Sequence, residues 1–286
     1  MKTKILLTVL LAVSISSVSA NEAAEPQADK SHYTIWNPTP RELMREMSTD
    51  RPDKTESAYT VDAGHFQIEA DVLSYAEDRH NDSNERVEGW SFFNANLKVG
   101  LCNNSDLQVV VPTYSSVRTR SAGTTERNSG FGDLVTRLKI NFWGNDGGTT
   151  AFAAMPYVKF PTAQDDLGNG AFEGGIIFPL AVALPHEWGM GLMTQFDFAE
   201  DGDGSGYHPE FINTITLSHD IVGNLAGYVE FFSLMSTDRD SDWIGTFDLG
   251  LTYALTEDIQ LDTGVNIGVT RSADDVNPFL GISWRF

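Results

Sequence analysis

From residue 64 onward, apolar and polar side chains alternate one by one in runs of about ten residues. In one run, Leu134, Leu138 and Phe142 fall on one face, whereas Arg137 and Lys139 fall on the other. A period of two is typical of β-strands with one apolar and one polar face. We therefore expect twelve strands, over residues 65–75, 90–99, 107–117, 132–143, 149–160, 173–184, 188–198, 210–218, 225–233, 243–253, 259–269 and 277–286.

The links between these runs alternate in length. Short links, together rich in Gly, Asn and Asp, lie at residues 100–106, 144–148, 185–187, 219–224 and 255–258. Longer links that carry much of the acidic charge lie at residues 76–89, 118–131, 161–172, 199–209, 234–242 and 270–276. Tight turns at one rim and long loops at the other are typical of outer-membrane barrels. We expect an all-β, antiparallel up-and-down transmembrane β-barrel of about twelve strands over residues 64–286.

A membrane location is favoured over a soluble β-sandwich by several features together. Strands of about 9–11 residues cross a bilayer when tilted by about 45°. We expect aromatic residues near the run ends to form two girdles at the headgroup levels: Trp90, Trp143, Tyr157, Trp188, Tyr228, Trp243, Tyr253 and Trp284. The C-terminal strand ends at Phe286, which resembles the signal that barrel-assembly machinery recognises.

The N-terminal part of the chain lacks the alternation of apolar and polar residues seen in the rest. Residues 1–20 have the charged start, short apolar core and small final residues of a signal peptide, which predicts cleavage near Ala20. Residues 21–63 are polar and irregular, with one short helix expected from Thr39 to Met47. We expect this segment to lie in the periplasm or to plug the barrel of a Gram-negative outer-membrane protein.

Composition excludes several classes of function. The 286 residues include 19 Lys and Arg against 40 Asp and Glu, a net charge of −21, which disfavours a nucleic-acid partner. Cys102 is the only cysteine and no two histidines have a metal-ligand spacing, so we expect no disulfide, no metal site and no cofactor.

The run from Asp201 to Gly206 resembles the start of a calcium loop, but Ile212 stands where the loop requires Glu. The acidic links could still bind divalent ions that bridge them to lipopolysaccharide phosphates, and we expect outer-membrane lipid and lipopolysaccharide as partners.

Several stretches together resemble one known family. They are residues 49–57 (TDRPDKTES), 59–69 (YTVDAGHFQIE), 130–134 (GFGDL), 159–163 (KFPTA), 167–169 (LGN) and 173–175 (EGG). They resemble the outer-membrane family named for a meta-pathway of phenol degradation, over roughly residues 49–286. The resemblance implies a β-barrel and a passive channel for small solutes. The family's name points to aromatic or other hydrophobic compounds, although no residue of this sequence establishes that class.

The polar faces of the runs supply candidate lumen-lining residues. They are Glu69, Asp71, Lys98, Asp133, Arg137, Lys139, Asp197, Glu230, Asp248, Asp262 and Arg285. Such charges can set the ion preference of an open pore, or they can pair and close the lumen. The charged residues Arg51, Asp53, Lys54 and Glu56 are candidates for a plug that pairs with them.

The leading hypothesis is therefore a channel without a chemical step. The alternatives are a barrel enzyme that acts on lipid and a closed structural or adhesive barrel. Ser218 and His219 are adjacent, so a strand would place them on opposite faces, which argues against a catalytic pair.

Overall fold

The computed structural model describes residues 28–239 and 241–286, so the expected signal peptide lies outside the described residues. These residues form one short 3-10 helix, η1 (Arg41–Leu43), and thirteen strands. The strands are β1 (Phe66–Asp78), β2 (Arg86–Cys102), β3 (Ser105–Ser121), β4 (Thr124–Gly130), β5 (Leu134–Trp143), β6 (Thr150–Phe160), β7 (Glu173–Ala183), β8 (Trp188–Glu200), β9 (Tyr207–Val222), β10 (Leu225–Ser236), β11 (Ile244–Thr256), β12 (Ile259–Gly268) and β13 (Val276–Arg285).

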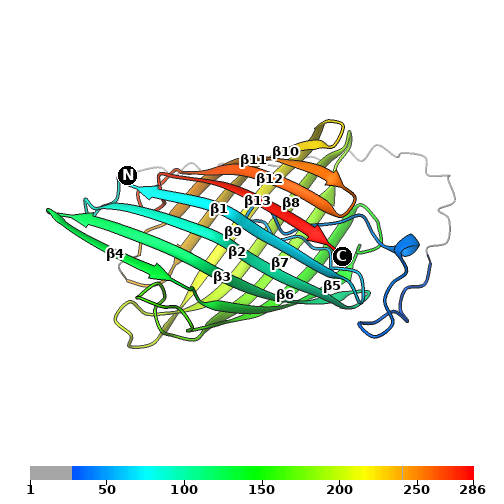
Figure 1. The fold of residues 1–286 in the computed structure, drawn as a ribbon, viewed down its shortest axis with the longest axis horizontal. Coiled ribbons are helices and arrows are strands. Elements are labelled where there is room, and N and C mark those ends of the chain that lie inside the picture. Colours follow the sequence, from blue (N-terminus) through cyan, green and yellow to red (C-terminus); the bar gives the residue numbers. More distant parts are fainter. Residues whose placement is uncertain (1–27, 240) are drawn as a thin grey trace, which may run out of the picture.

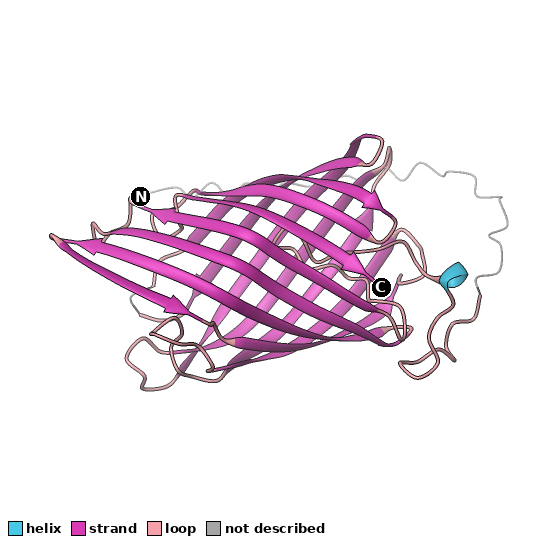
Figure 2. Ribbon diagram, in the orientation of Figure 1, coloured by secondary structure: helices cyan, strands magenta, loops and turns pink. Residues whose placement is uncertain are grey.

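Twelve of the described strands close into a barrel (Figures 1 and 2). Each pairs antiparallel with its neighbour in the chain, except that β4 is bypassed because β3 pairs with both β2 and β5. The first and last strands, β1 and β13, also pair antiparallel and complete the ring. The prediction of a twelve-stranded antiparallel barrel is confirmed.

One link predicted as a loop contains the strand β4. Residues 118–131 were expected to form a long loop, but β3 continues to Ser121 and β4 returns beside it from Thr124. Both residues of the connecting turn, Ala122 and Gly123, have positive φ, as tight hairpin turns require. Figure 1 shows this hairpin projecting beyond the other strands at the end opposite the C-terminus.

Side chains are arranged with polar groups inside and apolar groups outside. On β5, Lys139 is 0% exposed, whereas Phe142, three residues further along the same strand, is 58% exposed. This inversion of a soluble core is expected when lipid covers the outer face. The prediction of the aromatic girdles is wrong for two residues. Tyr157 points inward and donates a hydrogen bond to Asp197 at 2.6 Å, and Tyr228 is buried. Their hydroxyl groups find polar partners in the lumen that lipid does not offer.

The expected helix from Thr39 to Met47 is also corrected, because only η1 forms. The Thr39 N–H donates to Ala63 O and the Arg45 N–H donates to Asp62, so tertiary hydrogen bonds hold the flanking residues extended. No helix within residues 28–239 and 241–286 has the length and hydrophobicity needed to cross a membrane.

Candidate functional site

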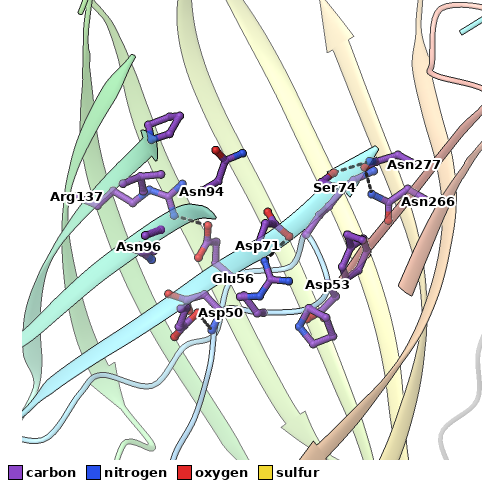
Figure 3. Close-up of a pocket in the computed structure, with 18 residues that line it drawn as sticks. Asp50, Asp53, Glu56, Asp71, Ser74, Asn94, Asn96, Arg137, Asn266 and Asn277 are labelled. Carbon is purple, nitrogen blue, oxygen red and sulfur yellow. Dashed lines mark hydrogen bonds and ion pairs between the residues drawn. The ribbon is translucent and has the colours of Figure 1, made fainter. Parts of the chain in front are cut away.

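Residues 49–57 enter the barrel and contact side chains around its interior. We call these residues the lumen segment. Figure 3 shows part of the lumen segment, with Asp50, Asp53 and Glu56 among side chains from several strands.

The centre of the lumen segment is held by two buried lysines. The Asp50 carboxylate forms ion pairs with Lys98 on β2 and Lys139 on β5. Lys98 also pairs with Glu69 on β1, and the Glu69 carboxylate accepts the Asp50 N–H at 2.9 Å. Removing one partner from such a buried group leaves an uncompensated charge, so this cluster holds the lumen segment in place.

Arg51 extends the contacts to the wall formed by β1, β12 and β13. Its guanidinium lies 2.7 Å from Asp71 and 2.7 Å from Asp262, and over the ring of Phe279 at 5.6 Å. A Cβ at Gly281 would lie 2.0 Å from Arg51 Nη2, so the glycine leaves the space that the guanidinium occupies.

Lys54 and Thr55 attach the lumen segment to β10 and β11. The Lys54 ammonium lies 3.1 Å from Asp248, and it lies over the ring of Phe232 at 4.5 Å. The backbone N–H groups of Lys54 and Thr55 both donate to Glu230 at 2.8 Å. These charge-assisted hydrogen bonds satisfy backbone groups that no strand pairs.

Glu56 completes the crossing. Its carboxylate lies 2.6 Å from the Arg137 guanidinium on β5, while Lys54 pairs with Asp248 on β11. The lumen segment therefore contacts two opposite parts of the barrel wall, at β5 and at β11. Several strands separate them in either direction around the ring (Figure 1).

Two cavities lie against the lumen segment. One of about 360 Å³ is lined by Asp71, Arg137 and Asn277, among others (Figure 3). A second, of about 500 Å³, is lined by residues of the turn between β7 and β8 and by Ser218. Asp53 and Glu56 line both cavities, so they form part of the partition between them.

The wall of β6–β10 carries an apolar patch inside the barrel. Its members are Met155, Tyr157, Ile177, Met193, Ile212, Phe232 and Leu234. The Glu56 N–H lies 3.4 Å from the Met193 sulfur, so this patch touches the lumen segment. The lumen thus has an apolar wall and a polar one.

The N-terminal chain is also tied to the rim of short turns. Lys30 lies 2.8 Å from Asp146 in the turn after β5, and Arg45 lies 3.3 Å from the same carboxylate. Partial burial alone would raise the pKa of Asp146, but hydrogen bonds from Lys30 and Asn103 and the charge of Arg45 hold it below its usual value.

Asp258, in the turn between β11 and β12, forms a second tie. It pairs with Arg41 of η1 and, at 2.9 Å, with Arg285 of β13. Burial opposes its ionisation, but the two arginines outweigh that effect and hold the pKa of Asp258 below its usual value.

The candidate lumen residues lie in three places. Most face the interior and contact the lumen segment directly: Glu69, Asp71, Lys98, Arg137, Lys139, Glu230, Asp248 and Asp262. Asp197 faces the interior beside Tyr157 but contacts none of residues 49–57 in any described interaction. Arg285 lies at the short-turn rim, and Asp133 lies before β5, where it accepts the N–H groups of Thr162 and Ala163.

The candidate plug residues Arg51, Asp53, Lys54 and Glu56 all lie inside the barrel. Sequence reasoning missed Asp50, which pairs with two lysines, and Thr55, whose hydroxyl lies 2.6 Å from that of Thr214. Both belong to the stretch 49–57, and their position in that stretch was the signal that could have identified them as site residues.

Ser218 and His219 do lie on opposite faces. Ser218 lines the second cavity, while the His219 ring packs outside against Trp188 with centroids 4.6 Å apart. Among the residues that the structure describes, no group of three or more His, Cys, Asp and Glu has an arrangement that could hold a metal ion.

Comparisons with known proteins agree with this architecture. The chain is similar in structure to an outer membrane channel from Pseudomonas putida F1, with a TM-score of 0.65, 11% identity, and coverage of 84% of this chain and 100% of that one. Overlaps with the NanC porin (TM-score 0.48, 11% identity, 77% and 98% coverage) and an anion-selective porin from Comamonas acidovorans (0.40, 9%, 78% and 98%) are weaker. A search of curated proteins found no match.

The sequence itself matches a family profile described as "Putative MetA-pathway of phenol degradation" over residues 49–286. The matched region begins at the first residue of the lumen segment and includes every strand of the barrel. The protein therefore belongs to this phenol-degradation family, and it has the fold of an outer-membrane channel.

Proposed function

We propose that the protein is a passive outer-membrane channel for small solutes, and that the lumen segment is its plug. The observation that carries the proposal is the crossing of the lumen by residues 50–56, with ion pairs to β5 on one side and β11 on the other. Passage between the two cavities then requires the partition at Asp53 and Glu56 to move.

The plug is attached by polar contacts, which favours reversible displacement over a fixed core. Ion pairs and hydrogen bonds can be exchanged for contacts to water when the lumen segment moves and water enters, whereas a close-packed apolar core offers no such replacement. The channel involves no chemical step, and its selectivity is set by the charges that remain on the wall when the plug moves.

The apolar patch supports a class of solute. Met155, Ile177, Met193 and Phe232 offer contacts to a hydrocarbon or aromatic ring, while Arg137 on the adjacent strand β5 and Asn277 on the more distant β13 offer hydrogen bonds. We propose small amphipathic compounds, including aromatic ones, as the transported class. Pockets with an apolar lining and a few polar groups are typical of sites for such molecules.

The direct test is single-channel conductance in a planar bilayer, with the full-length protein and a variant that lacks residues 21–60. The proposal predicts small or rare steps for the full-length protein and larger, frequent steps for the truncated one. Silence of both, with folding shown by heat-modifiable gel mobility, would contradict the channel function. Solute class is then tested by swelling of liposomes in a neutral aromatic alcohol against a sugar of similar mass.

A further inference from the structure

Arginines gather on the outer face of the barrel where β2, β3 and β4 extend beyond the other strands. Arg86 lies opposite Arg120 in the β2–β3 register, and Arg118 lies opposite Arg127 in the β3–β4 register. Like charges directly opposite one another repel, so each pair is favourable only with an anion nearby. Glu88 supplies that anion for Arg86 and Arg120, whereas no described carboxylate forms an ion pair with Arg118 or Arg127.

The direction of these side chains follows from the strand period. Tyr114, Ser116, Arg118 and Arg120 alternate along β3 on one face. The Tyr114 ring is exposed and packs against exposed Phe92 with centroids 6.2 Å apart, which marks this face as the outer one. The four arginines therefore project from the outside of the barrel wall, not into the lumen.

The carboxylates on this face neutralise only part of the charge. Glu88 pairs with Arg86 at 2.9 Å and with Arg120 at 3.1 Å, and Glu77 pairs with Arg86 at 2.7 Å. Within residues 28–239 and 241–286, neither Arg118 nor Arg127 has an ion-pair partner at all. Glu126 is the register partner of Thr119, so it lies on the opposite face of the hairpin.

A depression between the two unpaired arginines offers room for a ligand. It has a volume of about 180 Å³ and is lined by Glu88, Trp90, Ser116, Arg118 and Arg127. The Ser116 hydroxyl accepts a hydrogen bond from Arg127 Nε at 3.1 Å, which fixes that guanidinium at the edge of the depression. Guanidinium groups match the geometry of phosphate oxygens, which they bind bidentately.

The height of the depression matches the headgroup layer. Arg118 is four residues beyond the exposed Tyr114, a distance of about 13 Å along the strand, or about 9 Å along the membrane normal at a tilt of about 45°. Aromatic rings lie at the boundary of the hydrocarbon, so the arginines lie at the level of lipid phosphates. The long loops are at this end, which is the extracellular end in outer-membrane barrels.

We propose that Arg118 and Arg127, supported by Arg86 and Arg120, bind the phosphate of a phosphorylated glycolipid in the outer leaflet, the chemistry that lipopolysaccharide presents. This assignment differs from the sequence-based expectation, in which divalent ions bridge acidic loops to the same phosphates. It depends on insertion of the barrel in the membrane but not on conduction.

The test measures binding of bisphosphorylated lipid A to the protein expressed from the full chain and purified in detergent, in the presence of EDTA. We expect the variant Arg118→Ala/Arg127→Ala to bind at least tenfold more weakly. The matched control is Arg271→Ala, which removes an exposed arginine from a different outer loop and leaves the affinity unchanged. Heat-modifiable gel mobility shows that each variant is folded.

Dephosphorylated lipid A is expected to bind more weakly than the bisphosphorylated form by a similar factor. Equal affinity of the double variant and the unaltered protein would overturn the proposal. Loss of all binding in EDTA would assign the phosphate contacts to divalent ions instead. Full competition by millimolar inorganic phosphate would show a site for the free anion and not for the glycolipid.

Discussion

The lumen and the outer face of β2–β4 both concentrate basic side chains, but these side chains differ in whether a carboxylate of the chain pairs with them. In the lumen, Lys98, Lys139 and Arg137 each pair with a carboxylate of the lumen segment. On the outer face, Arg118 and Arg127 have no carboxylate partner among the described residues. Buried charge requires an internal partner, whereas charge at the headgroup level can take its partner from the membrane.

This contrast assigns different roles to similar residues. The inner basic groups hold a segment of the same chain, so their loss should affect stability and conductance together. The outer ones are available to a ligand, so their loss should affect binding and leave stability unchanged. The following variants separate the two effects, from the largest expected change to the smallest.

Removal of the central carboxylate should have the largest effect. Asp50→Ala leaves Lys98 and Lys139 without the carboxylate that they share, and we expect a loss of about 3 kcal/mol in the free energy of unfolding. Urea unfolding in lipid vesicles, followed by tryptophan fluorescence, measures it. The matched control Asp82→Ala removes an exposed carboxylate paired with Arg271 and should change the value by less than about 0.5 kcal/mol. An equal, small change in both variants would show that the lumen segment contributes nothing to stability.

Charge reversal at the partition should open the lumen. Arg137→Glu places a carboxylate beside Glu56, and repulsion between them should raise conductance and shift selectivity toward cations. The exchange Glu56→Arg/Arg137→Glu restores an ion pair and should return conductance toward its original value. The coupling energy from the corresponding double-mutant cycle is expected at about 0.5–3 kcal/mol. Unchanged selectivity in Arg137→Glu would place this side chain outside the conducting path.

Acid should loosen the attachment of the N-terminal chain at the short-turn rim. The pKa values of Asp146 and Asp258 are lowered in the folded protein, so their contribution is complete above the ordinary value of 3.8 and is lost as the pH falls below it. Proteolysis within residues 28–48 by an acid-stable protease should therefore be faster at pH 3 than at pH 5. Asp146→Asn/Asp258→Asn should already be cleaved rapidly at pH 5. Cleavage independent of pH in the unaltered protein would contradict this attachment.

The outer arginines should give the smallest change in stability. Arg118→Ala/Arg127→Ala should alter the free energy of unfolding by less than about 0.5 kcal/mol, because no described ion pair is lost. The same urea titration measures it, in vesicles without glycolipid. A loss comparable to that of Asp50→Ala would show that these side chains serve the fold and would remove the contrast.

The barrel was predictable from sequence because its signal is local and repeated. The period of two assigns Lys139 to the interior and Phe142 to lipid without knowledge of any partner. The hairpin of β3 and β4 was missed because residues 118–131 lie beyond the hydrocarbon core, where polar side chains on both faces give no alternation of hydrophobicity. The helix expected from Thr39 failed because hydrogen bonds to distant residues, such as Ala63, outweighed local preference.

The site was predictable only in part. Periodicity identified Glu69 and Asp262 as interior, but it gave no information on which charge of the lumen segment each would meet. Asp50 was missed because its importance comes from two lysines more than forty residues away in the chain. Ion-pair partners that are distant in sequence are set by the closed barrel and not by any local pattern.

The central claim is that the lumen segment must move for solutes to pass, and a reversible covalent tether tests it most directly. The Thr55 and Thr214 hydroxyl oxygens lie 2.6 Å apart, so cysteines at these positions are within reach of a disulfide of about 2.05 Å. Single-channel recording of Thr55→Cys/Thr214→Cys, with Cys102→Ser to prevent mispairing, should show no steps when oxidised and, after reduction, the small or rare steps expected of the unaltered full-length protein. Equal conductance in the two states, from protein whose disulfide is verified, would contradict the account.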